Sequence, residues 1–159
     1  MLTWREFRDV RPDLADAGHS LFYQVGSVGL GFLGTVRLDG GPRVHPMCPV
    51  ITDDGIYAML VPSPKLQDLL RDGRYAMHSF PCDDNEDAFY ITGRAATQDN
   101  AEVRDRVARQ FLAERSWDTP PPGFDEQDVL EFHIERCLLT RTTGHGDPEP
   151  QHTIWRAGS

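Results

Sequence analysis

The amino-acid sequence predicts a mainly β protein with short helices, built around a closed or nearly closed antiparallel barrel of six strands. Hairpin signals are the first observation. The segments DGG (39–41) and DDG (53–55) separate three consecutive apolar runs, and strands joined by such short turns pair antiparallel. Alternation of apolar and polar residues along the chain is the second observation. Towards the C-terminal end, apolar Leu130 and Phe132 flank polar Glu131, as in a strand with one buried and one solvated face.

The six expected strands are apolar runs bounded by turn residues. They occupy residues 32–38, 44–52, 56–61, 75–80, 88–97 and 129–140, and a last short segment follows at 152–157. Gly93 interrupts the fifth run, which is typical of a β-bulge. The run Pro120, Pro121 and Pro122 supplies no amide donors, so this part of the chain is expected to be a loop.

Helices are expected before the first strand and between later ones. Thr3 and Glu6 form a T-x-x-E capping box, the signature of a helix start, and Pro12 is a position where that helix can break. Asn100 can cap a later helix. Its apolar residues recur at the four-residue spacing of one helix face, at Val103, Val107 and Phe111.

Length and composition limit the classes of function. The 159 residues suit one domain spanning 1–159, and the formal net charge of −9 lacks the basic face that nucleic acid requires. No apolar run is long enough for a transmembrane helix, and the N-terminus is charged from Arg5, so neither a membrane nor a signal peptide is expected. Three widely spaced cysteines, Cys48, Cys82 and Cys137, are typical of a reduced cytoplasmic protein.

Several motifs are better explained by structure than by chemistry. The segment GLGFLG (29–34) matches G-x-G-x-x-G, but a strand pattern follows it where a dinucleotide site needs a helix. The acidic segment 83–87 lacks the spacing of a calcium loop and indicates a solvated turn. The six histidines show no H-x-x-x-H pairing, so no metal site is expected, and no residue stands out as a catalytic nucleophile.

The segment VPSPK (61–65) is the strongest candidate for a binding site. Ser63 stands where a helix N-cap belongs and Pro64 at the first helical position, in a helix expected from Ser63 to Asp72 and closed by Gly73. Lys65 is then in the first turn, where the helix dipole disfavours a cation. A bound phosphate would reverse that effect, since the helix amides, the serine hydroxyl and the ammonium would all face it. A solvated surface lysine is the other interpretation.

Three segments together resemble the pyridoxamine 5'-phosphate oxidase-like family, the FMN-binding split barrels, which includes flavin and deazaflavin oxidoreductases. They are LGTVRLDGGPRVHPMCPV (33–50), IYAMLVPSPKLQDLLRDGRYAMHS (56–79) and FYITGRA (89–95). The middle segment is the most specific, because it is similar to the family's arrangement of a strand, S-x-K and a helix. The resemblance implies a six-stranded split β-barrel and a homodimer with a flavin at each interface site.

The resemblance also assigns residues to the cofactor. Ser63 and Lys65 take the roles that hold the flavin phosphate, and His45 stands where the vitamin B6 oxidases have an arginine. The remaining positions would lie along the flavin ring, and they are Leu60, Val61, Met47, Cys48 and Pro49. The implied activity is hydride transfer between FMN and a small-molecule substrate, in which the cofactor supplies the chemistry.

Departures from the family pattern argue against pyridoxamine phosphate oxidation itself. Val50 replaces a lysine, Ala88 replaces a flavin-contacting glutamine, and the C-terminal R-x-H signature is missing. A deazaflavin-dependent reductase and a non-catalytic flavin- or haem-binding module on the same fold therefore remain as alternatives. Residues that could act near the ring are Arg37, Arg94, Arg156, Trp155 and His78, and the sequence does not choose among them.

Overall fold

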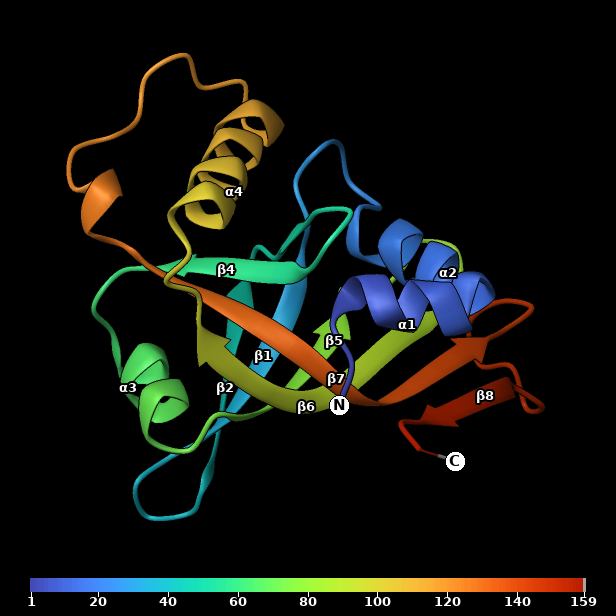
Figure 1. The fold of residues 1–159 in the computed structure, drawn as a ribbon. Helices are drawn as coiled ribbons and strands as arrows, with labels where there is room; N and C mark the ends of the chain where they lie inside the picture. The colour runs from blue at the N-terminus through green and yellow to red at the C-terminus, as the bar shows by residue number, and fades with distance from the viewer. Residues whose placement is uncertain (159) are drawn as a thin grey trace.

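The computed structural model describes residues 1–158. Its eight strands belong to one antiparallel sheet (Figure 1). They are β1 (Gly31–Val36), β2 (Pro42–Met47), β3 (Val50–Ile51), β4 (Ile56–Leu60), β5 (Arg74–Ser79), β6 (Ala88–Thr97), β7 (Asp128–Arg141) and β8 (Gln151–Arg156). The order across the sheet is β2-β1-β5-β6-β7-β4-β3, with β8 paired to β7. The curled antiparallel sheet confirms the expected mainly β barrel class.

The strand count differs from the expected six for two reasons. The second expected strand is divided: β2 pairs with β1, and β3 pairs with β4 at the opposite end of the strand order. Cys48 and Pro49 carry the chain from one sheet edge to the other, and Pro49 has no amide to donate to a ladder. The second reason is that the segment near the C-terminus forms a full strand, β8.

The expected bulge at Gly93 is present. The β6–β7 register shifts between Thr92 and Gly93. A Cβ on Gly93 would lie 1.9 Å from the carbonyl oxygen of His133, closer than any side chain allows. Only glycine therefore lets β7 approach β6 at the point where both strands bend.

The helices are α1 (Trp4–Val10), α2 (Pro12–Phe22), α3 (Pro64–Arg71) and α4 (Ala101–Glu114), with a 3-10 turn at Phe124–Glu126. The Thr3–Glu6 capping box forms as expected. The chain does break at Pro12, but a second helix follows at once, which the sequence pattern did not reveal. Figure 1 shows α1 and α2 together on one side of the sheet, and α3 and α4 towards its other end. Among residues 1–158, no helix has the length and apolarity to span a membrane.

Two hydrophobic clusters hold these layers together. The larger one lies between the sheet and the N-terminal helices and includes fully buried Phe7, Phe22, Phe89 and Phe132. The smaller one fixes α4 on the sheet through Val107, which packs with Val50, Tyr57 and Val129. The expected apolar face of the α4 helix is therefore confirmed.

Helix α3 is fastened by a buried carboxylate. Asp68 is only 4% exposed. It accepts hydrogen bonds from Thr35 Oγ1 of β1 (2.9 Å), Arg43 Nε of β2 (2.8 Å) and Arg71 Nη1 of its own helix (3.3 Å). Burial acts to raise the pKa of Asp68, but the hydrogen bonds from Arg43, Thr35 and Arg71 outweigh it and lower the pKa. One ionised side chain therefore connects α3 to two strands.

We predict that Asp68→Asn lowers the free energy of unfolding at pH 7 by about 2 kcal/mol, because it leaves Arg43 and Arg71 without their carboxylate. The partial exposure of both arginines keeps the loss below the roughly 3–5 kcal/mol of a fully buried pair. A folded-state pKa below the unfolded value of about 3.9 stabilises only above that pH. The difference from the wild type should therefore shrink below about pH 4.

Urea denaturation at pH 7 and at pH 3 measures this effect. Asp16→Asn is the matched control, since the Asp16 side chain is exposed on α2. An equal loss for both variants would show that Asp68 is not a structural anchor.

Candidate functional site

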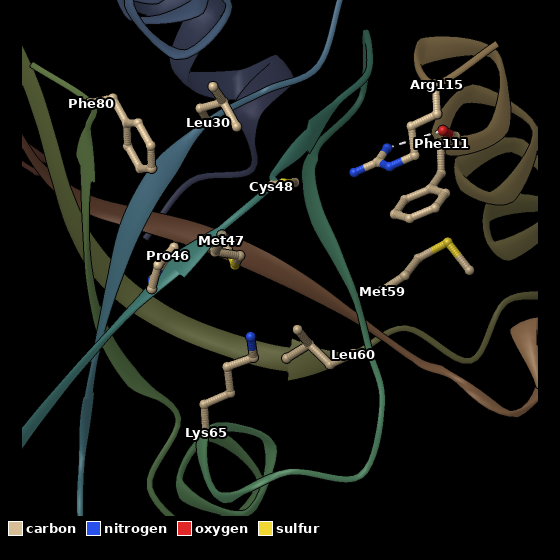
Figure 2. A pocket seen from close by; sticks show the side chains of 10 residues that line it. All are labelled: Leu30, Pro46, Met47, Cys48, Met59, Leu60, Lys65, Phe80, Phe111 and Arg115. Carbon is tan, nitrogen blue, oxygen red and sulfur yellow. Dashed lines mark hydrogen bonds between the residues drawn. The ribbon is translucent and has the colours of Figure 1, made fainter. Parts of the chain in front are cut away.

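A cavity of about 280 Å³ opens where β2, β4, α3 and α4 approach one another. Its walls are mainly apolar, and its charged groups are both cations; no carboxylate lines it. The lining residues are Leu30, Pro46, Met47, Cys48, Met59, Leu60, Lys65, Phe80, Phe111 and Arg115 (Figure 2). In a protein with a formal net charge of −9, a cavity with only positive charges indicates an anionic ligand.

Lys65 enters this cavity from the start of α3. Ser63 caps the helix, its Oγ accepting from the amide of Leu66 (3.4 Å), and Pro64 is the first helical residue. The expected cap is thus confirmed. No acidic residue lies in the first turn. The ammonium of Lys65 forms no ion pair with any of residues 1–158 and points into the cavity in Figure 2. Lys65 is also the only lysine in the sequence.

His45 lies on β2, outside the cavity lining but within reach of the charge of Lys65. Burial lowers the pKa of its imidazole, and the positive charges of Lys65 and Arg43 lower it further. Its Nε2 atom is buried and has no hydrogen-bond partner among the residues described. Because buried polar atoms are nearly always paired, this nitrogen indicates a partner that comes from outside the chain.

The other sequence-predicted residues are partly brought together. Met47, Cys48 and Leu60 line the cavity beside Lys65. Pro49 is buried just behind them. Val61 is outside the lining and 54% exposed.

The arginines proposed for the ring edge lie elsewhere. Arg37 pairs with Asp39 in the β1–β2 turn, Arg94 donates to the Asp72 carbonyl (2.8 Å), and Arg156 is on β8. None of the three lines the cavity. Two other candidates are also placed apart from it. Trp155 packs edge-on against Phe7 with ring centroids 4.9 Å apart, and exposed His78 contacts the Ser79 carbonyl.

The sequence interpretation missed the contribution of α4. Phe111 and Arg115 reach the cavity from the C-terminal end of this helix. The signal was present, because Arg115 continues the four-residue spacing that was interpreted as an apolar face. That face turns out to be core at Val107 and cavity wall at Phe111 and Arg115.

Comparison with solved structures identifies the fold. A candidate pyridoxamine 5'-phosphate oxidase from Listeria innocua matches with a TM-score of 0.62 and 15% identity, over 78% of this chain and 95% of that one. An F420 reductase matches with a TM-score of 0.55 and 16% identity, over 75% of this chain and 94% of that one. An FAD-binding protein from Mesorhizobium loti matches with a TM-score of 0.57 and 16% identity, over 76% of this chain and 88% of that one. Neither a protein-family model nor a curated protein matches the sequence. The chain has the pyridoxamine 5'-phosphate oxidase-like split-barrel fold.

In this split barrel, a polar network supports the wall of the cavity opposite α3. The Tyr23 hydroxyl accepts from the Ile51 amide (3.0 Å) and donates to Glu114 Oε1 (2.8 Å). Gln110 Nε2 donates to the Ile51 carbonyl (2.7 Å) and to the same carboxylate oxygen (2.9 Å). Burial is the main reason that the pKa of Tyr23 is raised. The network ties the β2–β3 passage to the end of α4, on which Arg115 lies.

Close backbone packing fixes the same passage. A Cβ on Gly29 would lie 2.3 Å from the carbonyl oxygen of Pro49. The glycine therefore allows the segment before β1 to lie directly against the passage, next to cavity residue Leu30.

We predict that Tyr23→Phe destabilises the split barrel by about 2 kcal/mol, because it leaves the Ile51 amide without its acceptor and removes one of the two hydrogen bonds to Glu114 Oε1. Tyr90→Phe is the matched control, since the hydroxyl of this partly buried tyrosine has no hydrogen bond within residues 1–158. Urea denaturation of the two variants and the wild type tests the prediction. A Tyr23→Phe variant as stable as Tyr90→Phe would contradict the role given to the network.

Proposed function

We propose that residues 1–159 form one FMN-binding domain that acts as an oxidoreductase on a small organic substrate. The observation that carries this proposal is the unpaired ammonium of Lys65 at the start of a helix, together with the buried, unpaired Nε2 of His45, which is near enough for the lysine charge to lower its pKa. The fold is shared with proteins named as an F420 reductase and an FAD-binding protein, which supports a flavin-type cofactor.

The residues present fit a phosphate. Lys65 would neutralise one of its charges. The Lys65 amide could donate as well, because Pro64 has no N–H and the Leu66 and Gln67 amides already donate to Ser63. The Ser63 hydroxyl already accepts from Leu66, so its own hydrogen would remain to donate to the phosphate. His45 would supply the remaining hydrogen bond through Nε2. This donor set is chemically suited to a phosphate monoester.

The ring of the cofactor would lie against the apolar wall formed by Met47, Cys48 and Leu60. When bound, the flavin supplies the hydride chemistry, and the protein orients it and limits access of water. No carboxylate or histidine lines this cavity, so its lining offers no acid–base pair. The chain's own residues would act by binding and positioning.

A second copy of the chain would complete the site. The cavity of about 280 Å³ lies at the lower limit of ligand pockets, roughly 300–1,000 Å³. Edge strand β2 pairs on one side only, and Val44 on it and Val61 beside the cavity are exposed by 66% and 54%. We therefore include a homodimer in the proposal. A monomeric mass of the FMN-loaded protein in sedimentation experiments would remove this part.

The expected cellular setting is the cytoplasm. Cys48, Cys82 and Cys137 are all free thiols, as is usual in a reducing compartment. Recovery of the protein outside the cytoplasm after cell fractionation would contradict this assignment.

The deazaflavin coenzyme is the second candidate, favoured by the shared fold of the F420 reductase. The substitutions Val50 and Ala88 mean that two groups used by the vitamin B6 oxidases are absent, so pyridoxamine phosphate oxidation is not proposed. Titration of the purified protein with FMN, the deazaflavin coenzyme and haem in parallel separates the possibilities. The visible spectrum of the protein as purified gives the first evidence, and binding of none of the three would end the proposal.

We predict that Lys65→Ala weakens FMN binding by about 10- to 100-fold, the effect of losing a charged hydrogen bond worth about 1.5–3 kcal/mol. Lys65→Arg keeps the charge and should retain most of the affinity. Since Lys65 is the only lysine, reductive methylation followed by mass spectrometry reports on it alone beside the N-terminal amine. FMN should protect Lys65 from methylation. Unchanged affinity in Lys65→Ala, together with no protection, would show that the ammonium does not contact the cofactor.

FMN binding should also depend on pH through His45. Without ligand, burial and the nearby cations keep the pKa of His45 below its usual 6.5. A phosphate dianion beside it would raise that pKa, so the complex would take up a proton that the free protein does not hold. Affinity should then rise several-fold, at most about tenfold, from pH 8 to pH 6.5. Below about pH 6 the phosphate itself becomes protonated and the gain should end.

The His45→Gln variant should bind FMN with little pH dependence over this range. Fluorescence titrations of both proteins at matched ionic strength provide the measurement. The assignment of His45 to the phosphate would be wrong if both proteins gave the same pH profile.

A further inference from the structure

The cavity contains a second cation that the phosphate site does not use. Arg115 enters from the end of α4, whereas Lys65 enters from the start of α3, and Figure 2 shows the two side chains on opposite sides of the cavity. The guanidinium points towards the space between them. An anion held at Lys65 therefore leaves Arg115 facing a different part of the cavity.

Arg115 is held in place by its own helix. Its guanidinium carbon lies 3.5 Å from the centroid of the Phe111 ring, and Nη1 donates to the Phe111 carbonyl (3.0 Å). Directly after it, Ser116 has a φ of 53°, a left-handed conformation uncommon for serine. This turn returns the chain over the end of α4, where the Trp117 amide donates to the Leu112 carbonyl (3.0 Å). The side chain is therefore oriented before any ligand arrives.

The local contacts do not use the whole guanidinium. The side chain is only 12% exposed, and the nearest carboxylate oxygen, Glu114 Oε2, is 3.8 Å from Nη1, beyond hydrogen-bonding distance. The other oxygen of Glu114 is already occupied by Tyr23 and Gln110. Neither Nε nor Nη2 of Arg115 has an acceptor within the described part of the chain. Glu114 balances the charge of the guanidinium at ion-pair distance, but Nε and Nη2 remain free to donate hydrogen bonds to a ligand.

We propose that Arg115 binds the carboxylate of the substrate, which would make the substrate class small organic acids with a flat apolar body. This inference rests on the proposed flavin site, because it takes Lys65 to be occupied by the cofactor phosphate. Arginine presents parallel N–H donors that match a carboxylate in its plane. Phe111, Met59 and Cys48 surround the space in front of it with apolar surface, so a polar or neutral hydrophilic molecule gains little there.

Benzoate is the probe for this site, and benzamide is its neutral isostere. Binding is measured twice: by perturbation of the flavin spectrum in the FMN-loaded protein, and by calorimetry in the flavin-free protein. We expect Arg115→Gln to weaken benzoate binding about 10- to 100-fold, with the affinity for FMN unchanged. Arg115→Lys should recover only part of the loss, because lysine keeps the charge but not the paired donors.

Arg109→Gln is the matched control. It removes the same charge from an exposed position of α4 outside the cavity lining, and it should leave benzoate binding unchanged. Wild-type protein should bind benzoate at least tenfold more tightly than benzamide. Thermal unfolding of every variant shows whether a loss of binding is a loss of fold, and Arg115→Lys provides the comparison if Arg115→Gln does not fold.

The two proposals fail in different ways. If FMN does not bind but benzoate still depends on Arg115 in the flavin-free protein, the cofactor assignment is wrong and the acid site stands. Equal benzoate affinity in wild type and Arg115→Gln would overturn the acid site, as would equal affinity of the wild type for benzoate and benzamide. A loss of FMN affinity in a folded Arg115→Gln protein would place this arginine in the cofactor site and would also overturn the inference.

Discussion

The buried carboxylate of Asp68 is the constraint on which the candidate site depends. It joins α3, which carries Lys65, to Arg43 of β2, two residues from His45. The two groups proposed to hold the phosphate come from separate elements, and this ion pair is the contact that fixes one against the other. Since the carboxylate is buried and receives three hydrogen bonds, a small shift of α3 would leave charged groups unpaired. The geometry of the site is therefore maintained by the same interaction that holds the helix on the sheet.

The opposite wall is maintained in a different way. There the β2–β3 passage contains a proline and leaves one ladder to join another, so its backbone groups need partners outside the sheet. Tyr23 and Gln110 supply them for Ile51, and both also bind Glu114. The cost of interrupting a strand is thus offset by a network that ends beside Arg115. The break at Cys48 and Pro49 connects β2 and β3, the two edge strands of the sheet. The hydrogen bonds of Tyr23 and Gln110 to Glu114 hold α4 beside this connection.

The sequence predicted those parts of the fold whose cause is local. Turn residues located the strands, the Thr3 and Ser63 caps located two helix starts, and Gly93 located the bulge, because each depends on backbone chemistry within a few residues. The division of the second strand was not predicted, because β2 and β3 each pair with a neighbouring strand through the expected hairpins. Only the tertiary path of Cys48 and Pro49 between the two sheet edges separates them. In the site, too, residues with a local signal could be predicted and residues placed by tertiary packing could not. Lys65 was recognisable because it conflicts with the helix dipole, whereas the role of Arg115 depends on where α4 packs.

Charge distribution explains why two cations in one cavity are informative in this protein. The chain has 25 acidic and 16 basic side chains, and most of the arginines discussed above are paired with nearby carboxylates. Lys65 has no such partner within residues 1–158, and Arg115 has only the carboxylate of Glu114 at 3.8 Å, while both face a cavity without a lining carboxylate. Two cations that line one mainly apolar cavity from separate helices are an arrangement that an anionic ligand would stabilise. A lysine suits a phosphate as a point charge, and a rigid guanidinium suits a planar carboxylate. The difference between the two cations thus favours two different anions, one at each end of the cavity.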